Sequence, residues 1–173
     1  MSQPLPFDPI SEGARQWQLH WGEEPVAAMA AVTSIMRAQQ VLLARLNGML
    51  AEFDLTFARY EALMLLYYSR AGELPLGKIS ERLQVHKASV TNVVNKLVSD
   101  GYVERISHAS DGRGVLARIT SEGQQVAGAA TAVLNEAEFG LGPLNRESCT
   151  ALFTLLEPLR RGAGDFNSPD DGD

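Results

Sequence analysis

Apolar positions recur with a helical period in two short segments within residues 76–99. Ile79 and Leu83 stand one helical turn apart in the first segment. The three residues 84–86 between the segments match the turn that joins the helices of a helix-turn-helix. An Asp-Gly pair at 100–101 ends the second helix, because glycine accepts the left-handed conformation that closes helices. The pattern predicts a helix-turn-helix whose second helix buries Val90, Val94, Leu97 and Val98.

Two β-prone runs follow this unit, at residues 103–107 and 115–119. Seven residues that include two glycines separate the runs, which is typical of the tip of a β-hairpin. Helix, turn, helix and a two-stranded wing together predict a winged helix-turn-helix. The predicted fold class is mainly α with a small β-hairpin wing, and with dimerisation helices at the N- and C-terminal sides.

Long amphipathic patterns flank the winged unit on both sides. Glu24-Pro25 opens a helix that is much longer than the ~11–12 residues of an average helix, since proline fits a first turn. Thr56, Thr120 and Asn145 are suitable N-caps for three further helices, because their side chains can accept from free backbone amides. The outer helices carry more apolar surface than a small lobe can cover. A two-fold homodimer, the commonest homo-oligomer, is therefore predicted.

The predicted organisation has five parts. Trp17 and Trp21 lie one turn apart in the first part. They pack on their own chain, cross to a partner subunit or line a ligand cavity, and the sequence leaves these alternatives open. The parts are an N-terminal arm (1–24, extended over 1–10 with a short helix at 11–21), a dimerisation helix (25–54), a DNA-binding lobe (55–119), C-terminal dimerisation helices (120–161) and a disordered acidic tail (162–173).

The outward face of the second helix is rich in short hydrogen-bonding side chains, which suit a major groove. Helices of this kind present their N-terminal residues to bases, so Ser89, Thr91 and Asn92 are candidates for base edges. The alternative is an ordinary solvated face, since exposed helix faces are polar by default. The candidates for phosphate contacts are Lys87, Asn95 and Lys96.

Several segments resemble the MarR family of bacterial regulators: residues 83–97, Gly101-Tyr-Val-Glu-Arg105, Asp111-Gly-Arg113 and residues 119–123. The resemblance implies that Asp111 braces Arg113 and that Arg113 enters the minor groove. Two positions depart from the family pattern. Gly112 stands where a second arginine is frequent, and His86 stands where a serine usually caps the reading helix.

The resemblance also implies a repressor that binds double-stranded DNA at a pseudo-palindromic operator, with half-sites about 10 base pairs apart. Many relatives release DNA when a small aromatic or acidic effector binds beside the reading lobe, which requires that the effector prefers one lobe spacing. The alternative is that the candidate ligand residues are plain core. These candidates are Trp17, Trp21, Met29, Thr33, Arg59, Tyr60, Met64 and Tyr67.

The formal net charge of −6 argues against DNA binding until it is divided along the chain. Residues 74–119 hold seven Lys and Arg against four Asp and Glu, a net of +3, so the remainder carries −9. A cationic lobe on an acidic body keeps the attraction to phosphate local. A protein-interaction module that binds through its acidic surface is the alternative function, and strong salt dependence on DNA would separate the two.

Motifs for other chemistry are missing from the sequence. There is no HExxH, no phosphate-binding glycine loop and no CxxC pair, so no metal, cofactor or catalytic site is predicted. His20, His86 and His108 stand beside no nucleophile signature. Cys149 is the single cysteine, either an inert thiol or a redox sensor, and it fits a cytoplasmic protein. No uninterrupted apolar stretch approaches the ~18–20 residues of a membrane span, so no membrane association is expected.

Overall fold

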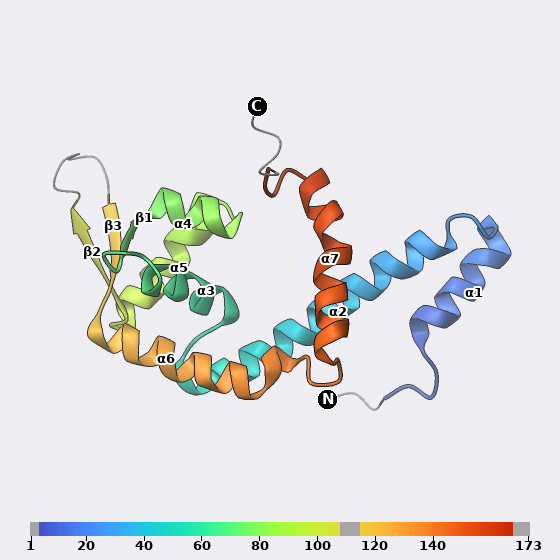
Figure 1. Ribbon diagram of the computed structural model, residues 1–173, viewed down its shortest axis with the longest axis horizontal. Coiled ribbons are helices and arrows are strands. Elements are labelled where there is room, and N and C mark those ends of the chain that lie inside the picture. Colours follow the sequence, from blue (N-terminus) through green and yellow to red (C-terminus); the bar gives the residue numbers. More distant parts are fainter. Residues whose placement is uncertain (1–3, 108–114, 168–173) are drawn as a thin grey trace. The chain divides into compact units, whose positions relative to one another are not determined.

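The computed structural model describes residues 4–107 and 115–167, and its helices and strands are labelled in Figure 1. The chain divides into two compact units, residues 1–45 and 46–173, which are described separately below. The elements are α1 (Pro9–Trp21), α2 (Val26–Leu50), η1 (Ala51–Phe53), α3 (Phe57–Tyr67), β1 (Glu73–Pro75), α4 (Leu76–Leu83), α5 (Lys87–Ser99), β2 (Val103–Ser107), β3 (Val115–Ile119), α6 (Ser121–Glu136), η2 (Glu138–Gly140) and α7 (Arg146–Gly162).

The second unit contains the winged helix-turn-helix expected from the sequence, with α4 and α5 followed by β2 and β3. Its sheet has three strands rather than two, in the antiparallel order β1-β3-β2. Residues 73–75, expected as a plain connection, form β1 by pairing Glu73 with Arg118 and Pro75 with Leu116. Three residues are too short for a period-2 pattern, and a proline normally argues against a strand. Pro75 is tolerated because β1 lies at the sheet edge.

The core of this unit contains the apolar residues that the sequence predicted to be buried on α5. Val90, Val94 and Leu97 are buried, and Val98 is partly buried against the same cluster. Helix α6 contributes small residues, and its alanines let it pack closely on α3. The cluster also includes the end of α2 and parts of α3, α4, α6 and the sheet, through Leu46, Leu50, Leu63, Leu66, Ile79, Ile119, Ala127, Ala130 and Leu134.

The three predicted N-caps of the second unit are confirmed. Thr56 accepts from the Arg59 amide, Asn145 from the Ser148 amide at 2.8 Å, and Thr120 from the Gly123 amide at 3.0 Å. The Thr120 hydroxyl also donates to the Gly101 carbonyl at 2.8 Å. Each cap satisfies an amide that the first helical turn leaves without a partner.

In the first unit, α1 begins earlier than expected. The arm was predicted to be extended over residues 1–10, but the helix starts at Pro9. Asp8 is its N-cap, and its carboxylate accepts from the Ile10 amide at 3.0 Å and the Ser11 amide at 3.3 Å. Proline at the first helical position lacks an amide that would otherwise need a partner, so a proline-rich start is compatible with a helix. None of the residues 9–21 of α1 is buried.

The long helix α2 combines a high mean hydropathy with polar interruptions. Residues Val26–Phe53 are long and apolar enough to cross a membrane, judged by length and composition alone, although no uninterrupted apolar run had been found. Polar residues such as Arg37 interrupt the run without lowering its mean hydropathy below that of a span. Apolar side chains exposed on α2 include Val32, Ile35, Met36, Val41 and Leu43.

Helix α7 has no buried residue along its described length and exposes Phe153, Leu155 and Leu159. A turn follows it, where Asp165 pairs with Arg160 of the last turn of α7 at 3.9 Å. Ordered structure therefore occupies the beginning of the segment for which a disordered tail was predicted. Residues 168–173 of that tail lie outside the described residues.

Candidate nucleic-acid interface

The turn between α4 and α5 is fixed by local hydrogen bonds. Gln84 closes α4 in the left-handed conformation (φ 52°), and its side-chain amide donates to the Glu81 carbonyl at 3.0 Å. The Ser80 hydroxyl donates to the Val85 carbonyl at 2.6 Å, while the Val85 amide donates to the Ser80 carbonyl at 3.2 Å. The angle between the two helices of the motif is therefore set by residues on both sides of the turn.

The N-terminus of α5 lacks a side-chain cap. His86 occupies the N-cap position, and its side chain makes no capping hydrogen bond, which confirms that it is a weak cap. The first amides of α5 therefore have no side-chain acceptor from the cap. Amides of this kind, at the positive end of the helix dipole, attract phosphate oxygens.

The outward face of α5 is arranged largely as predicted. Lys87, Ser89, Asn92, Asn95 and Lys96 are exposed. Thr91 differs, because it is only partly exposed and its hydroxyl donates to the Lys87 carbonyl at 2.9 Å. Its hydroxyl hydrogen is thus committed within the helix, and Thr91 can offer a base only an acceptor.

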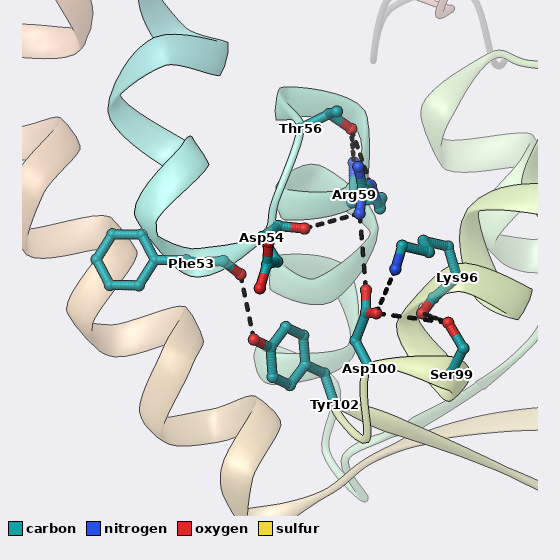
Figure 2. Close-up of polar contacts among 8 residues, drawn as sticks. All are labelled: Phe53, Asp54, Thr56, Arg59, Lys96, Ser99, Asp100 and Tyr102. Atoms are coloured by element: carbon teal, nitrogen blue, oxygen red, sulfur yellow. Dashed lines mark hydrogen bonds and ion pairs between the residues drawn. The ribbon is translucent and has the colours of Figure 1, made fainter.

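Lys96 is less available to phosphate than the sequence suggested. Its ammonium lies 2.5 Å from the Asp100 carboxylate, which also faces Arg59 at 3.6 Å (Figure 2). The i, i+4 spacing of Lys96 and Asp100 on one helix is the sequence signal that identifies such a pair. A phosphate would have to compete with Asp100 for this lysine.

Ion pairs also neutralise other cations that contribute to the net charge of +3 over residues 74–119. Arg118 on β3 binds Glu73 on β1 at 2.7 Å and Glu104 on β2 at 3.4 Å, and its hydrogen bond to Glu73 raises the pKa of Arg118. Lys78 binds Glu81 at 2.8 Å.

Within the described part of segment 74–119, three exposed cations make no ion pair: Arg82, Lys87 and Arg105. They lie at the end of α4, the start of α5 and on β2. Sequence reasoning missed Arg82 and Arg105, because only the pairing in space separates free cations from neutralised ones.

The strands of the predicted wing are confirmed, and β2 pairs with β3 from Val103–Ile119 to Ser107–Val115. Asp111 and Arg113, the residues that the resemblance places at the wing tip, lie outside the described residues, as does His108. Their roles in the minor groove remain predictions.

The candidate ligand residues fall into two groups, one in each unit. In the first unit the rings of Trp17 and Trp21 lie 6.3 Å apart, with Trp21 71% exposed. On α2, Thr33 donates to the Met29 carbonyl at 2.8 Å. This group therefore holds a solvent-facing aromatic pair, with Thr33 exposed and Met29 partly buried.

The group in the second unit divides further. Tyr60 and Met64 are buried in the core, where the Tyr60 hydroxyl lies 3.0 Å from the Thr131 hydroxyl, as the plain-core alternative expects. Arg59 faces Asp100, whereas Tyr67 is exposed against Tyr68.

The possible metal-binding and redox side chains can be located in the described part of the chain. No group of three or more His, Cys, Asp and Glu side chains there could hold a metal ion. Cys149 on α7 is a free, half-buried thiol.

Comparison with known proteins gives consistent matches. The model of the MarR family matches residues 53–114. The crystal structure of Sco5413, a MarR family transcriptional regulator from Streptomyces coelicolor, is 50% identical, with 83% of this chain and 99% of that chain covered and a TM-score of 0.76. A mutant of MarR from E. coli complexed with operator DNA is 25% identical, with 73% and 91% covered and a TM-score of 0.66.

Among curated proteins, the HTH-type transcriptional regulator BilQ of Clostridioides difficile (strain CD3) is 33% identical over 64 residues. That match covers 37% of this chain and 43% of BilQ, so the chain spans less than half the length of this curated relative.

The fold is that of the winged helix-turn-helix regulators to which the chain is similar. The chain belongs to the MarR family of transcriptional regulators, since it covers nearly all of a family member with which it shares half of the aligned residues. The family resemblance and the fold class inferred from the sequence are thereby confirmed. Members of this family are regulators and not enzymes, in agreement with the missing catalytic motifs.

Proposed function

We propose that the protein is a cytoplasmic homodimer that binds a pseudo-palindromic operator through α5 and represses transcription by occupying it. The observation that carries the proposal is the start of α5, where uncapped amides, the exposed Ser89 and Asn92, and the unpaired Lys87 coincide. Amides and lysine suit phosphates, while serine and asparagine suit base edges. Arg82 on α4 and Arg105 on β2 are further exposed cations of the same lobe that make no ion pair.

The proposed homodimer accounts for apolar surface that one chain leaves in solvent. Helix α2 exposes Val32, Ile35 and Met36, and α7 exposes Leu155 and Leu159. Large contiguous apolar surfaces are rare on monomers and typical of subunit interfaces.

Burial of α2 between subunits also explains its high hydropathy better than a membrane does. Arg37 stands near the middle of Val26–Phe53, where a bilayer would impose roughly 2.5–3.5 kcal/mol for one arginine. In a protein interface the same side chain can extend its charged end towards water.

We further propose that an aromatic or acidic effector relieves repression. The exposed Trp17 and Trp21 pair in the first unit supports an aromatic ligand, because exposed aromatic rings can stack on a third ring. The effector would have to bind more tightly to the DNA-free arrangement of the dimer than to the DNA-bound one.

Operator binding is tested by fluorescence anisotropy on a duplex taken from upstream of the protein's own coding region. The expected result is binding at least about 10³-fold tighter than to a scrambled duplex, with strong salt dependence, as for specific regulators. Equal, weak binding to both duplexes and to genomic fragments would contradict the proposal. It would favour a winged helix that contacts protein instead.

Lys87→Ala is expected to weaken binding to operator and scrambled duplexes by similar factors. Removal of one phosphate contact should also lower the slope of log K against log salt by about one. The measurement is the affinity at four or more salt concentrations. Arg15→Ala is the control, because Arg15 lies on α1 and is bound to Glu12 at 2.8 Å, and its slope should stay at the wild-type value. An unchanged slope in Lys87→Ala would remove Lys87 from the interface.

A further inference from the structure

The DNA-binding lobe, which contains the reading helix α5, is joined to the end of α2 by a short segment, residues 51–56, which we call the hinge. Within it Asp54 adopts the left-handed conformation (φ 53°, ψ 26°), which is uncommon for a residue other than glycine. Leu46 and Leu50, in the last two turns of α2, are buried in the core of the second unit. The end of α2 is thus anchored in the core of the same unit as α5, and the hinge joins it to α3.

Two side chains hold the backbone carbonyls of this hinge, as Figure 2 shows. The Arg59 guanidinium donates to the Asp54 carbonyl at 2.7 Å, and the Tyr102 hydroxyl donates to the Phe53 carbonyl at 3.2 Å. Arg59 also donates to the Thr56 hydroxyl at 3.3 Å. We call Arg59 and Tyr102 the carbonyl clamp.

Both members of the clamp are connected to the C-terminal end of α5. Asp100 is the C-cap of α5, and its carboxylate lies 3.6 Å from Arg59. Tyr102 follows the Asp100 cap after a single glycine, and its amide donates to the Leu97 carbonyl at 3.0 Å. Two separate paths therefore run from the reading helix to adjacent carbonyls of the hinge (Figure 2).

The burial of these groups strengthens the connection. The side chains of Arg59 and Asp100 are only 20% and 13% exposed, so solvent screens their attraction incompletely. One carboxylate oxygen of Asp100 is buried without a hydrogen-bond partner, and Arg59 is the cation that faces it. Burial and the nearby Asp54 and Asp100 raise the pKa of Tyr102, so its hydroxyl keeps the proton that it donates.

We propose that Arg59 and Tyr102, the two residues of the carbonyl clamp, are positioning residues that select the spacing of operator half-sites. The proposal rests on the proposed function as a DNA-binding homodimer. Neither residue lies on the outward face of α5. Both act through the hinge, by fixing the direction of α5 relative to the end of the helix that joins it to the dimer.

Half-site spacing is the property that such a clamp controls. Adding one base pair moves a half-site by about 3.4 Å and rotates it by roughly a tenth of a turn. In a two-fold dimer the two reading helices must change position together to follow that shift. A hinge held at two consecutive carbonyls resists the change, whereas a freed hinge accepts it at a smaller cost in free energy.

The test uses the double variant Arg59→Lys/Tyr102→Phe. Lysine keeps a cation near Asp100 but cannot serve three acceptors in the fixed geometry of a guanidinium. Phenylalanine keeps the ring and removes the hydroxyl. Affinities are measured for the natural operator and for operators with one base pair added or removed between half-sites. The double variant should lower the preference for natural spacing by roughly fivefold to tenfold, the size of one or two net hydrogen bonds. Its affinity for scrambled DNA and its salt slope should not change.

Tyr60→Phe is the matched control, because it also removes one tyrosine hydroxyl but breaks a contact with Thr131 rather than with the hinge. Its spacing preference should equal that of the wild type. Tyr102→Phe alone should show a smaller effect in the same direction, which protects the test if the double variant unfolds. An unchanged spacing preference, or an equal loss of affinity on every duplex, would overturn the proposal. Failure of the wild type to distinguish operator from scrambled DNA would instead overturn the proposed function, and this proposal with it.

Discussion

Gly123→Ala is expected to lower the free energy of unfolding by about 1–3 kcal/mol, the usual cost of forcing an extra carbon into a packed site. A Cβ at this position would lie 2.1 Å from the Tyr102 carbonyl oxygen and 3.0 Å from Ile119 Cγ1. The nearest atom belongs to the backbone, so no side-chain rotation can relieve the clash. The gain of roughly 1 kcal/mol that alanine brings to a helix interior does not offset it. Denaturant unfolding followed by circular dichroism measures the difference.

Gly128→Ala is the matched control in the same helix. Gly128 is exposed, and a Cβ there would meet nothing within 4 Å. Alanine should therefore raise the free energy of unfolding by about 0.5–1 kcal/mol through helix propensity alone. Two variants of equal stability would show that α6 does not pass so close to Tyr102. Such a result would also weaken the case for a fixed Tyr102 in the carbonyl clamp.

The regular parts of the fold could be predicted because their signals are local. The stripe of α5 follows from spacing alone, and three N-caps follow from the residue types that accept from free amides. Strand β1 was missed because its three residues form a strand only where β3 lies beside them. The start of α1 was missed because prolines suggested extended chain, although Asp8 and Pro9 together make a sound helix beginning.

The sequence predicted which residues of the candidate site lie on the outward face of α5. It did not predict which of the cations are free and which are neutralised by ion pairs. Residue types and period placed Ser89, Asn92 and Lys87 on the outside of α5, where the structure has them. Which cations are neutralised depends on partners from other elements, as when Arg118 finds Glu73 across the sheet. The carbonyl clamp could not be predicted from the sequence either, because its acceptors are backbone carbonyls, which every residue carries, and its donors come from other elements.

Leu155→Asp is expected to convert the proposed homodimer into monomers and to lower operator affinity by about 10²–10⁴-fold. Leu155 is 75% exposed on α7, so aspartate disturbs no packing within its own chain. At a subunit interface the same change would bury a carboxylate without a partner, which is strongly unfavourable. Light scattering coupled to size-exclusion chromatography measures the oligomeric state, and anisotropy measures the affinity.

Tyr68→Asp separates an interface effect from a general effect of added charge. Tyr68 is 74% exposed, nearly the same as Leu155, but it follows α3 in the reading lobe. This variant should remain dimeric. The large loss of affinity expected for Leu155→Asp comes from linkage, because a dimer that has bound one half-site meets the second at a high effective concentration and a monomer does not. A Leu155→Asp protein that stays dimeric would exclude this face of α7 from the interface. A monomer that keeps full affinity would mean that one reading lobe carries the whole recognition, and the argument for a pseudo-palindromic operator would then fail.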